Sequence, residues 1–148
     1  MNQSKILVIG ACGQVGTELV ETLANRFGNE NVIASDIRED AEFPVKYLKL
    51  DVMDRIAVKK TVIENNISEV YHLAALLSAT AENHPEFGWK LNMDGLFSVL
   101  DLARDGHLKK VFWPSSIAVF GPTTPRENTP QYTIIEPTTV YGISKFAG

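Results

Sequence analysis

The stretch from Lys5 to Leu19, KILVIGACGQVGTEL, places three glycines at intervals of three directly behind an apolar run. The apolar run is typical of a buried β-strand, and the residues after it have the pattern of a helix. In this context Gly10 predicts a tight turn, Gly13 the close approach of a ligand to the backbone, and Gly16 close packing of helix on strand. The stretch therefore predicts a strand, a turn and a helix arranged around a bound anion.

The start of this helix is the expected anion site. The N–H groups of Gln14 and Val15 lie in the first turn, where N–H groups have no partner within the helix, and the helix dipole adds partial positive charge. Both effects favour a pyrophosphate. The glycine spacing alone is weak, but Asp36 ends the next apolar run, in VIASDI. A carboxylate about 20 residues beyond the last glycine is the expected ligand of the adenine ribose hydroxyls of a dinucleotide.

Two residues bear on the choice of dinucleotide. The carboxylate of Asp36 would repel a 2′-phosphate, which favours NAD over NADP. Arg38, two residues further on, favours the opposite choice, because an arginine can pair with that phosphate. The sequence predicts NAD, with Asp36 and Arg38 beside the adenine ribose.

The rest of the chain alternates short runs of Val, Ile and Leu with helical patterns, which is typical of a parallel sheet covered on both faces. We expect strands near 5–10, 31–35, 46–50, 69–74 and 110–115. We expect helices near 14–27, 54–65 and 87–105. The sequence predicts an α/β fold over residues 1–148, a Rossmann-like doubly wound parallel sheet with strand order 3-2-1-4-5.

Composition limits the partners. The 148 residues are 45% hydrophobic and 22% charged, as in a soluble globular protein, and can form a core. A formal net charge of −4 and the lack of a Lys/Arg cluster argue against nucleic acid and membrane surfaces, which leaves small molecules. Cys12 is the single cysteine, so no intramolecular disulfide forms. No signal peptide or membrane span is evident, and we expect a cytoplasmic protein.

The expected helix at 87–105 is apolar around much of its circumference. One side would cover the sheet. The other side is either a subunit contact, which would make the protein a homodimer, or a contact with another helix of the same chain. Gly106 is the expected C-cap of this helix.

From Gly121 to Pro137 four prolines deny a continuous helix or central strand, so we expect an irregular loop. A loop of this length is either a substrate loop or an exposed connection. Its single cation is Arg126, whereas threonines are frequent and offer small hydroxyls. A helix that begins near Tyr141 would have hardly two turns before Gly148, so we expect the N-terminal portion of a longer chain.

Four residues form a candidate catalytic set. Ser115 and Ser116 are expected at the end of the fifth strand, and Tyr141 lies four residues before Lys145, so the last two share one face of a helix. A tyrosine has a pKa near 10, so proton transfer near neutral pH requires nearby positive charge. A lysine ammonium and the oxidised nicotinamide ring supply it. A serine hydroxyl would hold the substrate oxygen within reach of Tyr141.

Six motifs occur in order along the whole chain: GACGQVG, ASDI, LDV, HLAA, SSIAVFG and YGISK. Together they resemble the extended short-chain dehydrogenase/reductase superfamily, which includes nucleotide-sugar epimerases. The longer strings WPSSIAVFGPTTP and TPQYTIIEPTTVYGISK more particularly resemble its short-chain L-threonine 3-dehydrogenases. The resemblance implies that most of the substrate pocket comes from a C-terminal part absent from these 148 residues.

The resemblance also implies roles for individual residues. Tyr141 would be the acid/base, Lys145 its partner and a ligand of the nicotinamide ribose, and Ser116 the catalytic hydroxyl, with Ser115 binding substrate or sharing that role. Ser78 would approach the substrate, although a solvent-exposed loop serine is the alternative. Further positions implied at the cofactor are Asp51, Val52, Leu73, Ala74, Ala75 and Asn92.

The implied reaction is oxidation of the 3-hydroxyl of L-threonine to 2-amino-3-oxobutanoate, with NAD as hydride acceptor. One alternative is a UDP-sugar 4-epimerase of the same superfamily. Another is a non-catalytic NAD-sensing module, against which the intact Tyr141 and Lys145 argue. Ile117 and Ala118 stand where dehydratases of the superfamily carry an Asp-Glu pair, which argues against dehydration.

His72, His84 and His107 lack the mutual spacing and the cysteine or carboxylate neighbours of a metal site. The sequence predicts no metal, and His72 is interpreted as a histidine satisfied within the fold.

Overall fold

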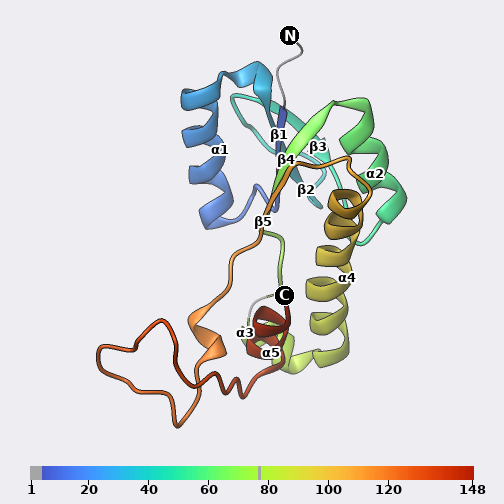
Figure 1. The fold of residues 1–148 in the computed structure, drawn as a ribbon. Coiled ribbons are helices and arrows are strands. Elements are labelled where there is room, and N and C mark those ends of the chain that lie inside the picture. Colours follow the sequence, from blue (N-terminus) through green and yellow to red (C-terminus); the bar gives the residue numbers. More distant parts are fainter. Residues whose placement is uncertain (1–4, 77) are drawn as a thin grey trace. The chain divides into compact units, whose positions relative to one another are not determined.

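The computed structural model describes residues 5–76 and 78–148 (Figure 1). In chain order the elements are β1 (Lys5–Ile9), α1 (Gln14–Phe27), the 3-10 turn η1 (Asn29–Asn31), β2 (Val32–Asp36), β3 (Lys46–Lys49), α2 (Arg55–Glu64), β4 (Ile67–His72), α3 (Ser78–Asn83), α4 (Pro85–Arg104), β5 (Lys110–Phe112), the 3-10 turn η2 (Ile117–Val119) and α5 (Val140–Ala147).

The chain forms two compact units. The first comprises the residues up to Ala74 together with Gly95–Trp113, and the second comprises Ala75–Asp94 together with Pro114–Gly148. The sheet belongs to the first unit. The second unit contains α3, the beginning of α4, η2 and α5.

The first unit is built on a five-stranded sheet with the order β3-β2-β1-β4-β5. All four strand pairs are parallel, with Val8 of β1 opposite Ala34 of β2 and Tyr71 of β4. The predicted fold class and strand order are confirmed. Because the strands are parallel, the carboxyl ends of β1, β2 and β4 meet at one edge of the sheet.

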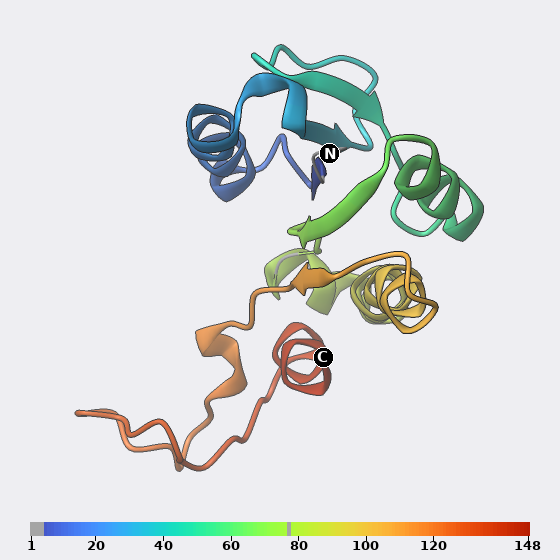
Figure 2. The same ribbon diagram turned by 45° about the horizontal axis from the view of Figure 1, so that its top comes forward.

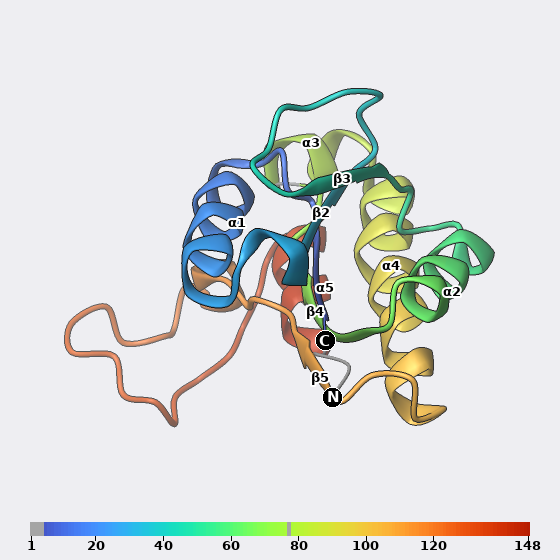
Figure 3. The same cartoon turned by 90° about the horizontal axis from the view of Figure 1, so that it is seen from above.

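Helices cover both faces of this sheet, α1 on one side and α2 with the later part of α4 on the other (Figure 3). Ile6 and Val8 point toward the α1 side, where they pack with Val20 and Leu23 of the helix. Leu7, between them in the chain, is fully buried. Burial on both faces explains why the strands are nearly continuous apolar runs rather than alternating ones.

Two strands differ from their predicted ranges by more than one residue at an end. β5 ends at Phe112 instead of continuing to 115, because Pro114 has no N–H to donate and restricts Trp113 before it. β4 runs from Ile67 to His72 rather than over 69–74. The chain leaves the strand after His72, where it passes the backbone of Gly10.

The second unit holds the irregular loop, which runs out from η2 and returns to α5 (Figure 2). The predicted loop over 121–137 and the helix near Tyr141 are confirmed. The hydroxyl of Thr139 accepts a hydrogen bond from Gly142 N at 3.0 Å and caps α5. Helix α3 was not predicted, because its sequence SATAEN has no apolar periodicity and buries only Ala81.

Helix α4 buries one apolar side. Met93, Leu96, Val99 and Leu102 are buried, whereas Phe97 and Leu100, three residues apart, are 46% and 39% exposed. The sequence predicted burial on two sides, whereas the described residues leave the side with Phe97 and Leu100 partly exposed. Gly106 follows the helix with φ +81°, as predicted for its C-cap.

Candidate functional site

The glycine-rich turn between β1 and α1 depends on very close backbone contacts. A Cβ on Gly10, which has φ +84°, would lie 2.5 Å from the backbone nitrogen of Ala74. A Cβ on Gly16 would lie 2.3 Å from the carbonyl oxygen of Gly10. No side chain fits at either position, so the packing of the protein itself requires both glycines.

Gly13 differs from these two glycines. The nearest atom to a Cβ there is Gly10 O at 3.4 Å, which is close to an ordinary contact, and the residue is exposed. Gly13 is also the N-cap of α1, no side chain caps the helix, and its first turn carries no acidic residue. The exposed backbone at Gly13 and the N–H groups of Gln14 and Val15 can therefore hold a pyrophosphate, which fits a dinucleotide.

Asp36 lies at the end of β2 and is half-buried beside the glycine-rich turn. Its Oδ2 accepts a hydrogen bond from Cys12 N at 3.0 Å, and its Oδ1 lies 3.4 Å from Arg38 N. Each carboxylate oxygen has two lone pairs, so both retain capacity for a ribose hydroxyl. The structure thus brings together Asp36 and the turn, which the sequence predicted as one site.

The other predicted cofactor positions of the first unit lie on two segments. Asp51, half-buried after β3, accepts a hydrogen bond from Met53 N at 2.9 Å. Val52 is buried, with its side chain against Gly95 and its carbonyl oxygen accepting a hydrogen bond from Ser98 at 3.0 Å. Leu73 and Ala74 follow β4 beside Gly10 and are half-buried. Their contacts with a cofactor stay predictions.

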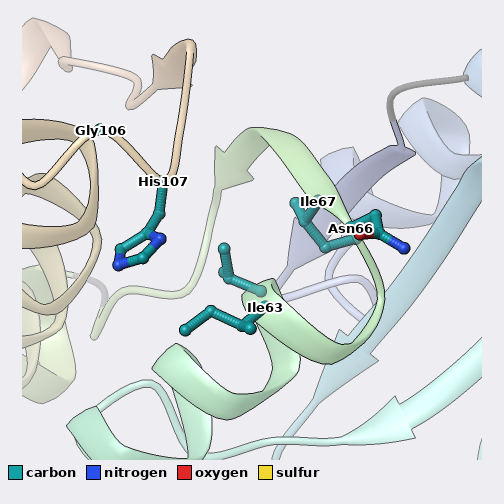
Figure 4. Close-up of a pocket in the computed structure, with 6 residues that line it drawn as sticks. Ile63, Asn66, Ile67, Gly106 and His107 are labelled. Carbon is teal, nitrogen blue, oxygen red and sulfur yellow. The ribbon is translucent and has the colours of Figure 1, made fainter. Parts of the chain in front are cut away.

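A shallow pocket of about 340 Å³ lies elsewhere on the first unit (Figure 4). Its lining includes Ile63, Asn66 and His107. Asn66 directly precedes β4 and His107 precedes β5, so the pocket lies at the amino ends of the strands. Ligands of open parallel sheets bind at the carboxyl ends, and the pocket is therefore separate from the cofactor site.

In the second unit, α5 carries both Tyr141 and Lys145 and packs against η2 and α3. A Cβ on Gly142 would lie 2.2 Å from the carbonyl oxygen of Ala118. Glycine at this position therefore allows the turn of Tyr141 to lie directly against the segment that begins with Ser116.

Lys145 is a buried cation. It is 4% exposed, its Nζ donates to the carbonyl oxygen of Pro114 at 2.9 Å, and it lies 5.9 Å from the centroid of the Tyr141 ring. Burial lowers the pKa of Lys145 from 10.5 to about 8. The ammonium is thus still mostly charged at neutral pH, with a positive charge beside the tyrosine ring.

The sequence predicted that the two serines end the fifth strand. They do not, because β5 stops before Pro114. Ser116 is the N-cap of η2, and its hydroxyl accepts from Ala118 N at 3.2 Å. Ser115 is exposed, and its hydroxyl donates to the carbonyl oxygen of Lys145 at 3.3 Å. Ser116 therefore contacts the segment at Ala118 against which Gly142 of α5 lies, and Ser115 contacts the backbone of α5 at Lys145.

Asn92 of α4 joins three segments of the second unit. Its Oδ1 accepts from Leu76 N at 2.9 Å, and its Nδ2 donates to the hydroxyl of Ser144 in α5 at 3.0 Å. Asn92 is 1% exposed, so these bonds lie in a buried environment. This arrangement supports the position of α5, and a role of Asn92 at the cofactor stays a prediction. Ser78 begins α3, and Ala75 lies in the segment before it.

The structure adds one residue of α5's surroundings that the sequence analysis missed. Glu82 of α3 accepts a hydrogen bond from Val140 N at 2.6 Å, at the first residue of α5. The two residues are 58 positions apart in the chain, and no local pattern connects them. A carboxylate at a helix N-terminus also interacts favourably with the helix dipole.

Most threonines of the loop have engaged hydroxyls. Thr123 donates to Glu136, Thr124 to the carbonyl oxygen of Ile134, and Thr129 to that of Pro125. Thr139 caps α5. These hydroxyls stabilise the loop itself, which weakens the expectation that they serve a ligand.

The described residues contain no group of three or more His, Cys, Asp and Glu side chains that could hold a metal ion. His72 is fully buried in β4 and lies against Gly95. None of the helices in the described part of the chain combines the length and hydrophobicity needed to cross a bilayer.

A parallel sheet with a glycine-rich turn, an uncapped helix start and a carboxylate after β2 defines a dinucleotide-binding protein of the Rossmann type. Residues 6–148 match the model of the NAD dependent epimerase/dehydratase family, and the chain belongs to this family. The predicted superfamily is confirmed, and so is NAD as its cofactor.

A curated relative from Staphylococcus epidermidis, an uncharacterized epimerase/dehydratase, is 51% identical over 148 residues. The alignment covers 97% of this chain and 46% of the relative, so the chain spans about half of the relative's length.

Solved structures of similar proteins include L-threonine dehydrogenases. The GalE-like L-threonine dehydrogenase from Cupriavidus necator, a holo form, is 52% identical, with a TM-score of 0.94 over 97% of this chain and 47% of that one. A partial consensus L-threonine 3-dehydrogenase is 54% identical, with a TM-score of 0.93 over 97% of this chain and 46% of that one. The UDP-glucose 4-epimerase from Thermotoga maritima is more distant, at 25% identity and a TM-score of 0.86, over 97% of this chain and 48% of that one.

The different surroundings of the glycines give a testable prediction. Gly16→Ala should lower the free energy of unfolding by about 1–3 kcal/mol, because its methyl group overlaps the backbone. Gly13→Ala should lower it by less than about 1 kcal/mol but weaken NAD binding at least tenfold, about 1.4 kcal/mol, because its methyl group takes the space of the pyrophosphate. Urea unfolding and calorimetric titration with NAD measure the two effects. Unchanged NAD affinity in Gly13→Ala would contradict the assignment.

The buried Lys145 gives a prediction for pH. Between pH 8 and 10.5 the lysine is more often protonated in the unfolded chain than in the folded one. The free energy of unfolding should therefore increase with pH across this window, by about 1 kcal/mol per unit from this group. Lys145→Met should lose this contribution. Urea unfolding of both proteins at pH 7, 8, 9 and 10 isolates it as a difference, and parallel pH curves would refute the prediction.

Proposed function

We propose that the protein carrying this chain oxidises the 3-hydroxyl of L-threonine to 2-amino-3-oxobutanoate, with NAD as the oxidant. The observation that carries this proposal is the identity of 54% and 52% with two structures named as L-threonine dehydrogenases, over 97% of this chain. The candidate site agrees with it, because the chain holds both the features of a dinucleotide site and a tyrosine beside a buried lysine.

In this proposal each unit of the chain has its own task. In the first unit, the N–H groups of Gln14 and Val15 bind the pyrophosphate over Gly13, and Asp36 accepts hydrogen bonds from the adenine ribose. Half-buried Asp51 borders the adenine. Gly13, Gln14 and Val15 are exposed and Asp36 and Asp51 are half-buried, so these contacts need no rearrangement of the glycine-rich turn.

In the second unit, Tyr141 accepts the proton of the substrate hydroxyl and Ser116 positions the hydroxyl oxygen. Lys145 holds a positive charge beside the tyrosine ring, fixed by its bond to Pro114. Bound NAD supplies the acceptor for the hydride that leaves the same carbon. The proton and the hydride together account for the two electrons and two hydrogens removed from the alcohol.

The second candidate is a UDP-sugar 4-epimerase. The family description and the curated relative's name both include epimerases, and the Thermotoga maritima enzyme was solved with UDP-glucose. A UDP-sugar carries an anionic pyrophosphate of its own and needs cations or helix N-termini for it. The loop between η2 and α5 offers only Arg126 as a cation, so we favour the amino acid substrate.

The two candidates differ in net cofactor turnover. With L-threonine and NAD, the full-length protein that carries this sequence should accumulate NADH, measured by absorbance at a wavelength at which NADH absorbs and NAD does not. L-2-aminobutyrate, which lacks the 3-hydroxyl, is the matched control and should give none. UDP-galactose should be neither bound nor converted to UDP-glucose. No NADH from L-threonine, together with interconversion of the UDP-sugars, would transfer the assignment to the epimerase.

The role of Tyr141 can be separated from folding and cofactor binding. Tyr141→Phe keeps the ring and removes only the oxygen, so kcat should fall by about 10²- to 10⁴-fold, the usual contribution of a general base. The Kd for NAD should change by less than about twofold, because the adenosine contacts remain. Tyr132→Phe, at a loop residue that is 96% exposed, is the matched control and should leave kcat unchanged. Near-normal kcat in Tyr141→Phe would assign proton transfer to another group.

We also propose that α4 forms a homodimer contact through Phe97 and Leu100. The two side chains lie three residues apart on one helix face and are partly exposed. A related L-threonine 3-dehydrogenase, 48% identical to this chain, is described as monomeric, so the association state needs a direct test.

Replacing both residues by Asp should convert a dimer of the full-length protein to a monomer, since two charges would be buried in the contact. Light scattering coupled to size-exclusion chromatography measures the mass. Ile56→Asp, at an apolar residue of α2 that is 82% exposed, is the control and should keep the dimer. A monomeric wild-type protein, or a double variant that remains dimeric, would reject this contact.

A further inference from the structure

Tyr47 of β3 joins the two segments that meet at Asp36. Its hydroxyl donates a hydrogen bond to the carbonyl oxygen of Arg38 at 2.8 Å and lies 4.0 Å from Cys12 Sγ. Its ring is stacked on Phe43, with the centroids 5.9 Å apart and the planes at 15°. The side chain therefore reaches from the sheet to the turn after β2 and to the glycine-rich turn.

Asp36 lies within the same set of contacts. Its Oδ1 lies against Arg38 N, and its Oδ2 accepts from Cys12 N. Arg38 thus has both contacts: its N–H approaches Asp36, and its carbonyl oxygen accepts the hydrogen bond from Tyr47. Because the second carboxylate oxygen is fixed by Cys12, movement of the turn at Arg38 would change the orientation of the carboxylate.

The hydroxyl of Tyr47 stays protonated over a wide pH range. Its pKa is raised to about 12, with burial as the largest cause and the neighbouring Cys12 and Asp36 as further contributions to this rise. The positive charge of Arg38 opposes these effects. Tyr47 therefore remains a hydrogen-bond donor to Arg38 at any pH at which the protein is expected to work.

We propose that Tyr47 is a positioning residue of the cofactor site, which sets the preference for an unphosphorylated adenine ribose by holding the turn from Asp36 to Arg38. With the turn held, Asp36 presents its free lone pairs to the ribose hydroxyls, and the backbone of Arg38 is fixed at its carbonyl. Without the bond from Tyr47, the turn relaxes, Asp36 loses its orientation and Arg38 gains freedom to pair with a 2′-phosphate. This inference rests on the proposed placement of the adenine ribose at Asp36.

The test uses two probes that differ only in the 2′-phosphate: ADP-ribose and 2′-phospho-ADP-ribose. Their Kd values are measured by calorimetric titration of the full-length protein. In Tyr47→Phe, which keeps the ring and its stack on Phe43, the Kd for ADP-ribose should rise about fivefold, the effect of one hydrogen bond. The Kd for the phosphorylated probe should rise by less than about twofold, because Arg38 compensates. The preference of the protein for ADP-ribose over the phosphorylated probe, measured as the ratio of their Kd values, should therefore decrease.

Three further variants make the result decisive. Tyr71→Phe in β4 is the matched control and should leave both Kd values unchanged, because its ring lies beside Phe112 rather than at Asp36. In an Arg38→Ala background, Tyr47→Phe should raise both Kd values equally. Asp36→Ala should weaken the binding of ADP-ribose. If it does not, the proposed ribose site is wrong, independently of the results for Tyr47.

Given an effect of Asp36→Ala, two outcomes would overturn the role of Tyr47 alone. One is a Kd for ADP-ribose in Tyr47→Phe that equals the wild-type value. The other is an equal rise for both probes in Tyr47→Phe itself, which is the result expected if the tyrosine only stabilises the fold. Thermal unfolding of each variant, with and without ADP-ribose, confirms that the titrated protein is folded.

Discussion

The candidate cofactor site depends on backbone segments that lie too close together for any side chain to come between them. The positions of a Cβ on Gly10 and on Gly16 fall 2.5 Å and 2.3 Å from neighbouring backbone atoms. These contacts hold the start of α1 at the carboxyl edge of the sheet, where its first N–H groups are exposed. They also bring Cys12 N within 3.0 Å of Asp36. The phosphate and ribose features of the site therefore share one steric origin.

The second unit uses the same principle with other residues. Close approach of Gly142 to Ala118 places α5 against η2, and the buried amide of Asn92 connects α5 to the segment after β4. An amide is suited to this position because it donates to one segment and accepts from another at the same time. The orientation of Tyr141 and Lys145 thus depends on residues that need not touch a substrate.

The sequence predicted the features that arise from local patterns. Strand order and the pairing of Asp36 with the glycine-rich turn follow from the βαβ rhythm and the carboxyl edge it creates. Prediction from the sequence failed for features that depend on contacts between segments far apart in the chain. The early end of β5 could have been predicted from Pro114, but the hydrogen bond from Val140 N to Glu82 and the position of Tyr47 arise from tertiary contacts without a local signal. The difference between Gly13 and its neighbouring glycines likewise became visible only from the atoms around each one.

The burial of Lys145 supports a chemical role for this residue more strongly than its spacing from Tyr141 does. Removing an ammonium from water is unfavourable, and the lowered pKa of Lys145 reports that the folded chain bears this cost. An apolar side chain of similar length would fill the same volume without this cost. The bond to Pro114 reduces the cost but does not restore the ordinary pKa. A buried lysine that costs stability beside the tyrosine ring agrees with the proposed role of its positive charge there.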